Sequence, residues 1–162
     1  MSVLDGTEIV YVARVPVKRV ITIALGVGAR LPAYTASMGR VLLAGLEDAE
    51  MDRVLAASRL APLTSFTLCK PRALRAEILK VRQQGYSLVM QELELGLCAI
   101  AVPVRDRRNA VIAALNVGMQ YNKESRMRAL QVILPALQKT SAEIERAIAH
   151  QWAPPPAEAG AA

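Results

Sequence analysis

The sequence is poor in the residues from which catalytic and metal sites are usually built. Its 162 residues include one histidine, His150, and two cysteines, Cys69 and Cys98. A zinc site needs three or four good ligands, and no paired cysteine spacing indicates a disulfide framework. His150 lies beside the C-terminal tail, where the sequence offers it no partner for nucleophilic catalysis. We therefore expect neither an enzyme active site nor a bound metal or cofactor.

Aromatic residues and long apolar runs are also scarce. Phe, Trp and Tyr make up 4% of the chain, so the core must be built from Val, Ile, Leu and Ala, with few platforms for stacking bases or sugars. No apolar run approaches the roughly 20 residues of a membrane-spanning helix, and the first residues lack the pattern of a secretory signal peptide. We expect a cytoplasmic protein without membrane contact.

Charge of one sign prevails, but without the motifs of a nucleic-acid-binding protein. The formal net charge is +6, while 53% of the residues are hydrophobic and 21% are charged, a composition typical of one globular domain. The basic residues are scattered, and no helix–turn–helix or zinc-finger pattern accompanies them. We interpret them as a solvated surface whose field also favours a small anionic ligand.

Alternating apolar residues predict five strands. They cover residues 8–17, 20–27, 86–93, 97–105 and 110–120. The first two are close enough to pair as a hairpin. The last two are joined by a tight turn in which Asn109 is the residue most tolerant of a positive φ. Two hairpins favour a largely antiparallel sheet.

Four helices complete the predicted secondary structure. They cover residues 36–46, 47–59, 71–84 and 122 to about 150. Thr35 or Ser37 is the expected cap of the first helix, and Asn122 that of the last. Pro71 suits the first position of the third helix and Gly85 its end. The predicted order is two strands, three helices, three strands and a last helix. Together with the two hairpins, this order predicts an α+β fold in which helices flank the sheet.

The last predicted helix carries an apolar stripe at alternating steps of three and four residues. Its members are Met127, Leu130, Leu134, Leu137, Ser141, Ile144 and Ile148. Such a stripe suits either the core of the domain or a partner helix. The sequence leaves both interpretations open.

Three features are candidates for a site. Glu92 and Glu94 are two residues apart and share a face if the segment is a strand. They are either a carboxylate pair for acid–base catalysis or a charged strand edge whose charges pair with nearby arginines. Asn116 is the only polar side chain in the apolar strand AALNVG. If it points inward it needs a hydrogen-bond partner, for which a ligand is one candidate; alternatively it bonds neighbouring backbone or faces water. The loop that enters the first helix ends at free N–H groups, which favour an anion or a carboxylate.

Three segments carry a resemblance to a known family. LPAYTASMGRVLLAGL (31–46), VRQQGYSLVMQELELGLCAIAVPVRD (81–106) and AVIAALNVG (110–118) resemble the effector-binding domain of the IclR family of transcription regulators, especially its branch that controls aromatic-acid catabolism. The resemblance implies a GAF-like fold with a cavity beside the sheet. The pocket wall that it implies includes Leu31, Ser37, Met38, Val89, Ala99, Asn116 and Gly118.

Two further residues are added to this candidate site from their chemistry. The backbone N–H groups from Ser37 to Gly39 suit a carboxylate, and Arg30 is a candidate ionic partner for it. The predicted function is therefore to bind a small aromatic or keto acid and to control DNA binding allosterically in a dimer or tetramer. DNA would be contacted only through a winged-helix domain that is absent from this sequence.

The expected organisation is an effector-binding domain over residues 1–150 followed by a flexible tail rich in Pro and Ala over residues 151–162. Two other functions stay open at this point. The first is an oligomerisation module without a ligand. The second is a GAF-like redox enzyme that uses Cys69 and Cys98.

Overall fold

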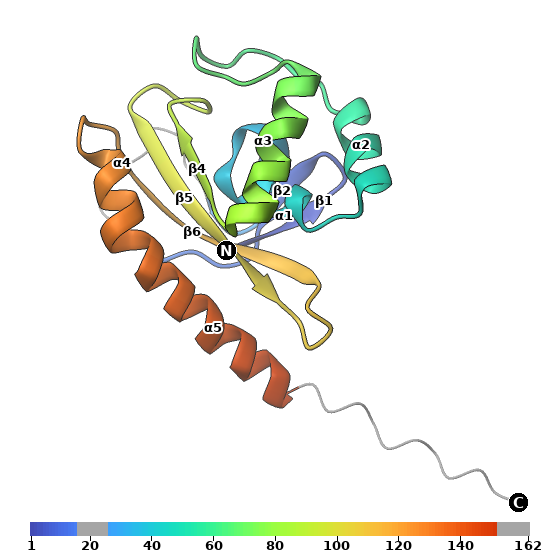
Figure 1. Cartoon of the computed structure of the whole chain (residues 1–162), viewed down its shortest axis with the longest axis vertical. Coiled ribbons are helices and arrows are strands. Elements are labelled where there is room, and N and C mark those ends of the chain that lie inside the picture. Colours follow the sequence, from blue (N-terminus) through green and yellow to red (C-terminus); the bar gives the residue numbers. More distant parts are fainter. Residues whose placement is uncertain (16–25, 152–162) are drawn as a thin grey trace, which may run out of the picture.

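The centre of the fold is one six-stranded antiparallel sheet, seen in a computed structural model that describes residues 1–15 and 26–151 (Figure 1). The strand order is β3-β2-β1-β6-β5-β4, and all neighbours run antiparallel. The strands are β1 (Ser2–Asp5), β2 (Glu8–Tyr11), β3 (Arg30–Pro32), β4 (Ser87–Met90), β5 (Leu97–Arg105) and β6 (Val111–Gln120).

Helices cover both faces of this sheet. On one face α1 (Ser37–Ala44) contacts β1, β4, β5 and β6, while α3 (Pro71–Gln84) packs on α1 and α2 (Asp48–Ala57) lies against α3. On the other face α4 (Ser125–Arg128), the π-helical segment η2 (Ala129–Ile133) and α5 (Leu134–Gln151) follow one another and cross β5 (Figure 1). The predicted α+β class is confirmed.

Strand β5 separates two cores. Ala101 belongs to the cluster around α1, whereas its neighbours Ile100 and Val102 belong to the cluster under α5. Successive side chains of a strand point to opposite faces, and both faces of β5 are covered. This double burial explains why β5 is an almost continuous apolar run rather than an alternating one.

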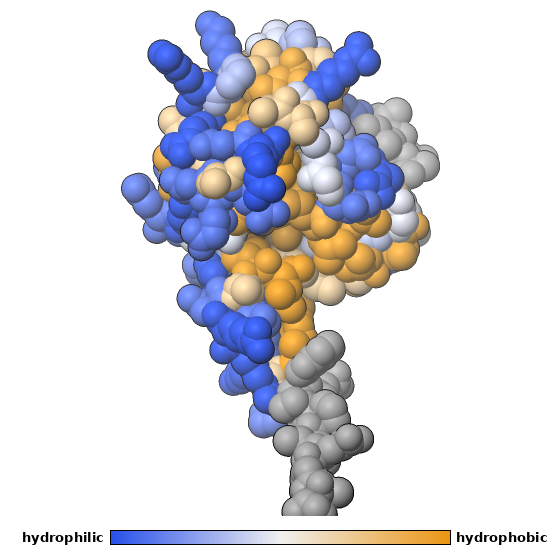
Figure 2. All heavy atoms as spheres, turned by 90° about the vertical axis from the view of Figure 1, so that its right-hand side faces the viewer, coloured by the Kyte–Doolittle hydropathy of each residue, from blue (hydrophilic) through white to orange (hydrophobic). Residues whose placement is uncertain are grey.

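The stripe on the last helix serves the core. Leu137 and Ser141 are buried, and Leu130 and Leu134 pack in the cluster under α5, whereas Met127 is 55% exposed. Figure 2 shows the polar residues of the helix gathered along one side and an apolar strip along the other. The helix passes through η2 directly before Pro135, whose missing N–H removes one α-helical hydrogen bond and favours such a local change of pitch.

Local sequence rules predicted several boundaries correctly. α3 starts at Pro71 and ends at Gly85, which has the left-handed φ of 77° that an L side chain rarely adopts. The turn between β5 and β6 places Asn109 at φ 64°, as expected. The final helix, in contrast, begins at Ser125 after Glu124 and has no side-chain cap, so the prediction that Asn122 caps it is wrong. Asn122 Oδ1 instead accepts a hydrogen bond from the Glu124 N–H at 2.9 Å in the turn before the helix.

Other predicted boundaries were wrong. The strand predicted over residues 8–17 ends at Tyr11, and most of the one predicted over 20–27 lies outside the described residues. The strands β1 and β3 were not predicted. β1 and β2 are joined by the two-residue turn Gly6-Thr7, in which Gly6 has a φ of 61°, so a glycine at the first central position was an overlooked hairpin signal.

The predicted cap of the first helix was also wrong. The residue before α1 is Ala36, and no side chain bonds to the free N–H groups of the first turn. Thr35 Oγ1 donates instead to the Pro32 carbonyl at 3.1 Å. Among the described helices, none combines the length and the apolar character that crossing a bilayer requires.

Candidate functional site

A hollow lies between the start of α1 and the inner face of the sheet. Its lining comes from β2 to β6, from the entry to α1 and from the turn after β4. The lining residues are Tyr11, Leu31, Thr35, Ala36, Ser37, Met38, Val89, Gln91, Glu92, Leu93, Leu97, Ala99, Asn116 and Gly118. The cavity volume is about 30 Å³, enough for about two water molecules, so the hollow is nearly closed in this structure.

The structure brings seven of the nine predicted site residues together. Leu31, Ser37, Met38, Val89, Ala99, Asn116 and Gly118 all line the hollow. They come from four strands and one helix, which explains why no local pattern groups them. Their role in binding stays a prediction.

Ser37 supplies the most distinctive polar group of the wall. It is 3% exposed, and its Oγ is one of two buried side-chain polar atoms without a hydrogen-bond partner among the described residues. The N–H groups of the first turn of α1 lie beside it and are not capped by any side chain. Buried polar groups normally have partners, so this end of the hollow is suited to an anionic acceptor.

Asn116 is the second polar group of the wall. It is half-buried in β6, opposite Ala101 of β5. Its carboxamide makes no hydrogen bond to another side chain or backbone group of the described residues. The alternative that neighbouring backbone groups bond Asn116 is therefore not seen there. It therefore has one acceptor and two donors to offer at the hollow.

Gly39 does not line the hollow but allows the wall to form. A Cβ atom at this position would lie 2.1 Å from the carbonyl oxygen of Ala33. The backbone of α1 therefore packs directly against the backbone of η1 (Ala33–Thr35), and only a glycine permits this close approach. The predicted role of the Gly39 N–H group in binding a carboxylate stays a prediction.

Arg30 also lies outside the hollow. Its Nε donates to Glu8 at 2.7 Å and its Nη2 to Asp5 at 2.7 Å, on the exposed edge formed by β1 to β3. These hydrogen bonds raise the pKa of Arg30. The sequence argument overlooked them because it did not predict β3, which pairs Arg30 with β2.

A buried ion pair borders the hollow and was not predicted. Arg40, 2% exposed through its side chain, forms two hydrogen bonds to the carboxylate of Glu92, with Nη1 at 2.8 Å from Oε1 and Nη2 at 2.5 Å from Oε2. Arg40 Nε donates to the Tyr34 carbonyl at 2.8 Å. The pair joins α1 to a segment 52 residues later, and only the suggestion that the glutamates answer arginines pointed toward it.

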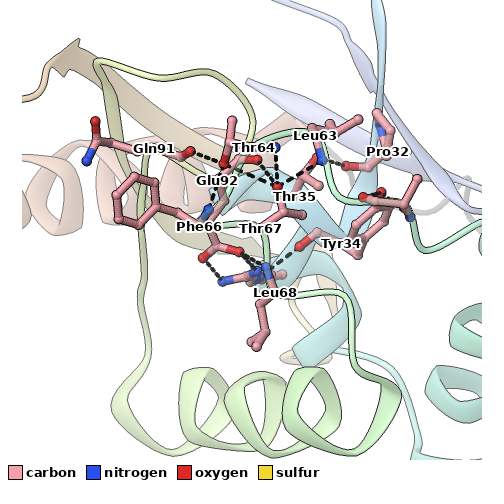
Figure 3. Close-up of polar contacts among 12 residues, drawn as sticks. Pro32, Tyr34, Thr35, Leu63, Thr64, Phe66, Thr67, Leu68, Gln91 and Glu92 are labelled. Atoms are coloured by element: carbon pink, nitrogen blue, oxygen red, sulfur yellow. Dashed lines mark hydrogen bonds and ion pairs between the residues drawn. The ribbon is translucent and has the colours of Figure 1, made fainter.

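The loop over residues 61–69 fastens to the same segment (Figure 3). Thr64 Oγ1 donates to the Gln91 carbonyl at 2.6 Å and Thr67 Oγ1 to the Glu92 carbonyl at 2.7 Å. The Leu68 N–H donates to Glu92 Oε2 at 2.8 Å. The wall of the hollow at Gln91 and Glu92 is thus held by two other parts of the chain.

The expectation that Glu92 and Glu94 form a pair on one strand is wrong. β4 ends at Met90, and Gln91 adopts a φ of 61°, which turns the chain out of the strand. Glu92 then faces Arg40, while Glu94 Oε2 is buried and has no hydrogen-bond partner within residues 1–15 and 26–151. The two carboxylates therefore do not form an acid–base pair. Among the described residues, no cluster of three His, Cys, Asp or Glu side chains suits a metal ion.

Cys98 is expected to resist alkylation in the native protein. It is fully buried, and burial raises the pKa of its thiol, so less of the reactive thiolate is present at any given pH. Iodoacetamide at pH 8 should label the partly exposed Cys69 first and Cys98 only after addition of urea. Equal rates for both thiols in the native state would contradict this, and mass spectrometry of peptides distinguishes them. A protected thiol of this kind argues against a redox pair.

Comparisons with known proteins agree with this geometry. Residues 1–146 match the family described as bacterial transcriptional regulator IclR C-terminal. The chain is 44% identical over 145 residues to the Pca regulon regulatory protein of Pseudomonas putida, covering 89% of this chain and 50% of that protein. It thus spans about half the length of this curated relative.

Solved structures give the same result for the fold. A transcriptional regulator of Rhodococcus sp. RHA1 is 43% identical, with a TM-score of 0.87 over 92% of this chain and 61% of that one. The inducer-binding domain of the PobR transcription factor from Acinetobacter, a double mutant in complex with 3-hydroxybenzoic acid, is 35% identical. Its TM-score is 0.82 over 89% of this chain and 85% of that one. These relatives are named regulators, not enzymes.

Proposed function

The chain belongs to the IclR C-terminal family of bacterial transcription regulators, as effector-binding domain, and we propose that its effector is a small aromatic carboxylic acid. The observation that carries this proposal is the hollow beside α1, with apolar walls and the unpartnered Ser37 hydroxyl at one end. The bound 3-hydroxybenzoic acid of the Acinetobacter relative supports the same ligand class.

Two kinds of contact in the hollow would contribute to the binding free energy: hydrogen bonds to the carboxylate and burial of the ring. A carboxylate at the first turn of α1 would accept hydrogen bonds from backbone N–H groups and from Ser37 Oγ, and each charged hydrogen bond contributes about 1.5–3 kcal/mol. Micromolar affinity needs about 8 kcal/mol. Burial of the ring against Val89, Leu97 and Ala99 must therefore supply the larger part.

Binding requires the hollow to widen. Its volume of about 30 Å³ is far below the roughly 300–1,000 Å³ of most small-molecule pockets. Met38 is the wall residue best suited to move, because methionine is unbranched and adapts to irregular spaces. It is 1% exposed, and its Sδ accepts a hydrogen bond from Ser2 Oγ at 3.2 Å. An effector that binds only the widened form shifts the domain toward it, which is the requirement for allosteric control.

In the full-length regulator this change would act on DNA binding. We expect a coupling free energy of about 1–3 kcal/mol between effector and operator, enough to change promoter occupancy several-fold. The proposed arrangement is a domain over residues 1–150, a tail over 151–162, a separate winged-helix domain for DNA, and self-association to a dimer or tetramer. The cytoplasm is the expected location.

A thermal-shift panel tests the ligand class. Hydroxybenzoates at 100 times their dissociation constant should stabilise the native state by about 2.7 kcal/mol, because a ligand that binds only this state raises its stability. The melting temperature of a domain of about 150 residues should then rise by roughly 5–10 °C. Phenol, which lacks only the carboxylate, is the matched control. A melting temperature unchanged by aromatic and keto acids alike would favour an oligomerisation module without a ligand.

Substitution of Ser37 by alanine is expected to weaken binding of benzoates about tenfold, since the change removes one hydrogen bond to a charged group. Arg30→Ala should leave the affinity unchanged, because Arg30 is engaged with Glu8 and Asp5 away from the hollow. Isothermal titration of the two variants measures both effects. If Arg30→Ala weakened binding and Ser37→Ala did not, the carboxylate would bind at Arg30, and the site would lie at the edge of the sheet.

A further inference from the structure

Glu92, which lines the hollow, has an unused acceptor site. A carboxylate offers about four lone-pair sites, two on each oxygen. Three of these are occupied: Oε2 accepts from Arg40 Nη2 and from the Leu68 N–H, and Oε1 accepts only from Arg40 Nη1. The side chain is 12% exposed and lines the hollow. Oε1 therefore retains one acceptor site among the described residues.

The carboxylate is also held rigidly in this position. Arg40 binds it with both terminal nitrogens, and Arg40 is itself fixed by its bond to the Tyr34 carbonyl. The Glu92 backbone carbonyl accepts from Thr67 Oγ1, so main chain and side chain are both restrained (Figure 3). An acceptor fixed before the ligand arrives loses little conformational entropy on binding.

Two polar parts of the wall of the hollow differ in chemistry. The first turn of α1 with Ser37 offers hydrogen-bond donors, whereas Glu92 offers an acceptor with a negative charge. Arg40 already forms an ion pair with Glu92, so it does not serve as the counter-ion of the ligand. A monocarboxylate bound at Ser37 would therefore meet Glu92 with a group that donates a hydrogen bond.

We propose that Glu92 is a specificity-determining residue that accepts a hydrogen bond from a ring hydroxyl of the effector, with Arg40 as its positioning residue. The inference rests on the proposed function and narrows its ligand class to hydroxylated aromatic monocarboxylates. A buried acceptor left without its donor is costly, so acids lacking the hydroxyl are rejected. A hydrogen bond from a hydroxyl to a carboxylate is among the stronger ones in proteins.

Ligand pairs test this on the unmodified protein. 3-Hydroxybenzoate and 4-hydroxybenzoate are titrated beside 3-fluorobenzoate and 4-fluorobenzoate, because fluorine is of similar size but cannot donate. At least one hydroxy acid should bind about tenfold or more tightly than its fluoro partner. Equal affinities within both pairs overturn the inference while leaving the proposed function intact. Absence of binding by all four acids removes the proposed function, and this inference with it.

Variants test whether Glu92 is the residue that distinguishes hydroxybenzoates from fluorobenzoates. Glu92→Gln should lower the ratio of hydroxy to fluoro affinity toward one, because the amide is uncharged and its single oxygen is taken by Arg40 and the Leu68 N–H. Asp48→Asn is the matched control, since it removes a carboxylate from an exposed arginine pair away from the hollow and should preserve the ratio. The ratio is insensitive to a general loss of stability, which would lower both affinities. A full ratio retained in Glu92→Gln assigns the hydroxyl to another group and overturns the inference.

Discussion

Replacing Gly39 by alanine is expected to unfold the domain or to destabilise it by more than about 3 kcal/mol. The new Cβ would lie 2.1 Å from the carbonyl oxygen, 2.5 Å from Cα and 2.6 Å from the carbonyl carbon of Ala33. All three atoms belong to the backbone, so no side-chain rotation relieves the clash, and α1 must separate from η1. Overpacking typically costs about 1–3 kcal/mol and more where nothing can yield, out of a total stability of about 5–15 kcal/mol.

Urea unfolding followed by circular dichroism measures this effect. Gly26→Ala is the control, because a Cβ at Gly26 meets no atom of the described part of the chain within 4 Å and its φ lies outside the left-handed region. That variant should unfold at nearly the same urea concentration as the unmodified domain. A Gly39→Ala protein with an unchanged midpoint would show that the contact between α1 and η1 is loose, and the account of how the hollow is closed would fail.

Breaking the buried ion pair from its basic side is the second large expected effect. Arg40→Met should cost about 3–5 kcal/mol, because it leaves the mostly buried Glu92 carboxylate without its partner. It also leaves the Tyr34 carbonyl without its donor. Glu92→Gln is milder, since the amide oxygen can still accept from the Leu68 N–H and from Arg40.

A double-mutant cycle separates the pair from these neighbouring bonds. The double variant Arg40→Met/Glu92→Gln should be less destabilised than the sum of the single variants by about 0.5–3 kcal/mol, the range found for directly contacting groups. Urea midpoints of the four proteins supply the data. Strict additivity would mean that the two side chains do not interact in solution as they do here.

The sequence predicted the C-terminal half of the fold better than the N-terminal half. The boundaries of α3 follow from Pro71 and Gly85, and the β5–β6 turn follows from Asn109. These are local rules, in which one residue fixes its own φ or lacks its own N–H. β1 and β3 are strands of four and three residues, too short for a period of two to be recognised, and they are ordered by their neighbours in the sheet.

The candidate site divides along the same line. The sequence by itself determined the class of fold, the family resemblance and, through that resemblance, seven residues that line one hollow. Only the tertiary structure decided which charges are free. It joined Arg40 to Glu92 across 52 residues and assigned Arg30 to Asp5 and Glu8 at the sheet edge. Periodicity and turn chemistry act over a few neighbouring residues, whereas an ion pair depends on which distant segments the sheet topology brings together.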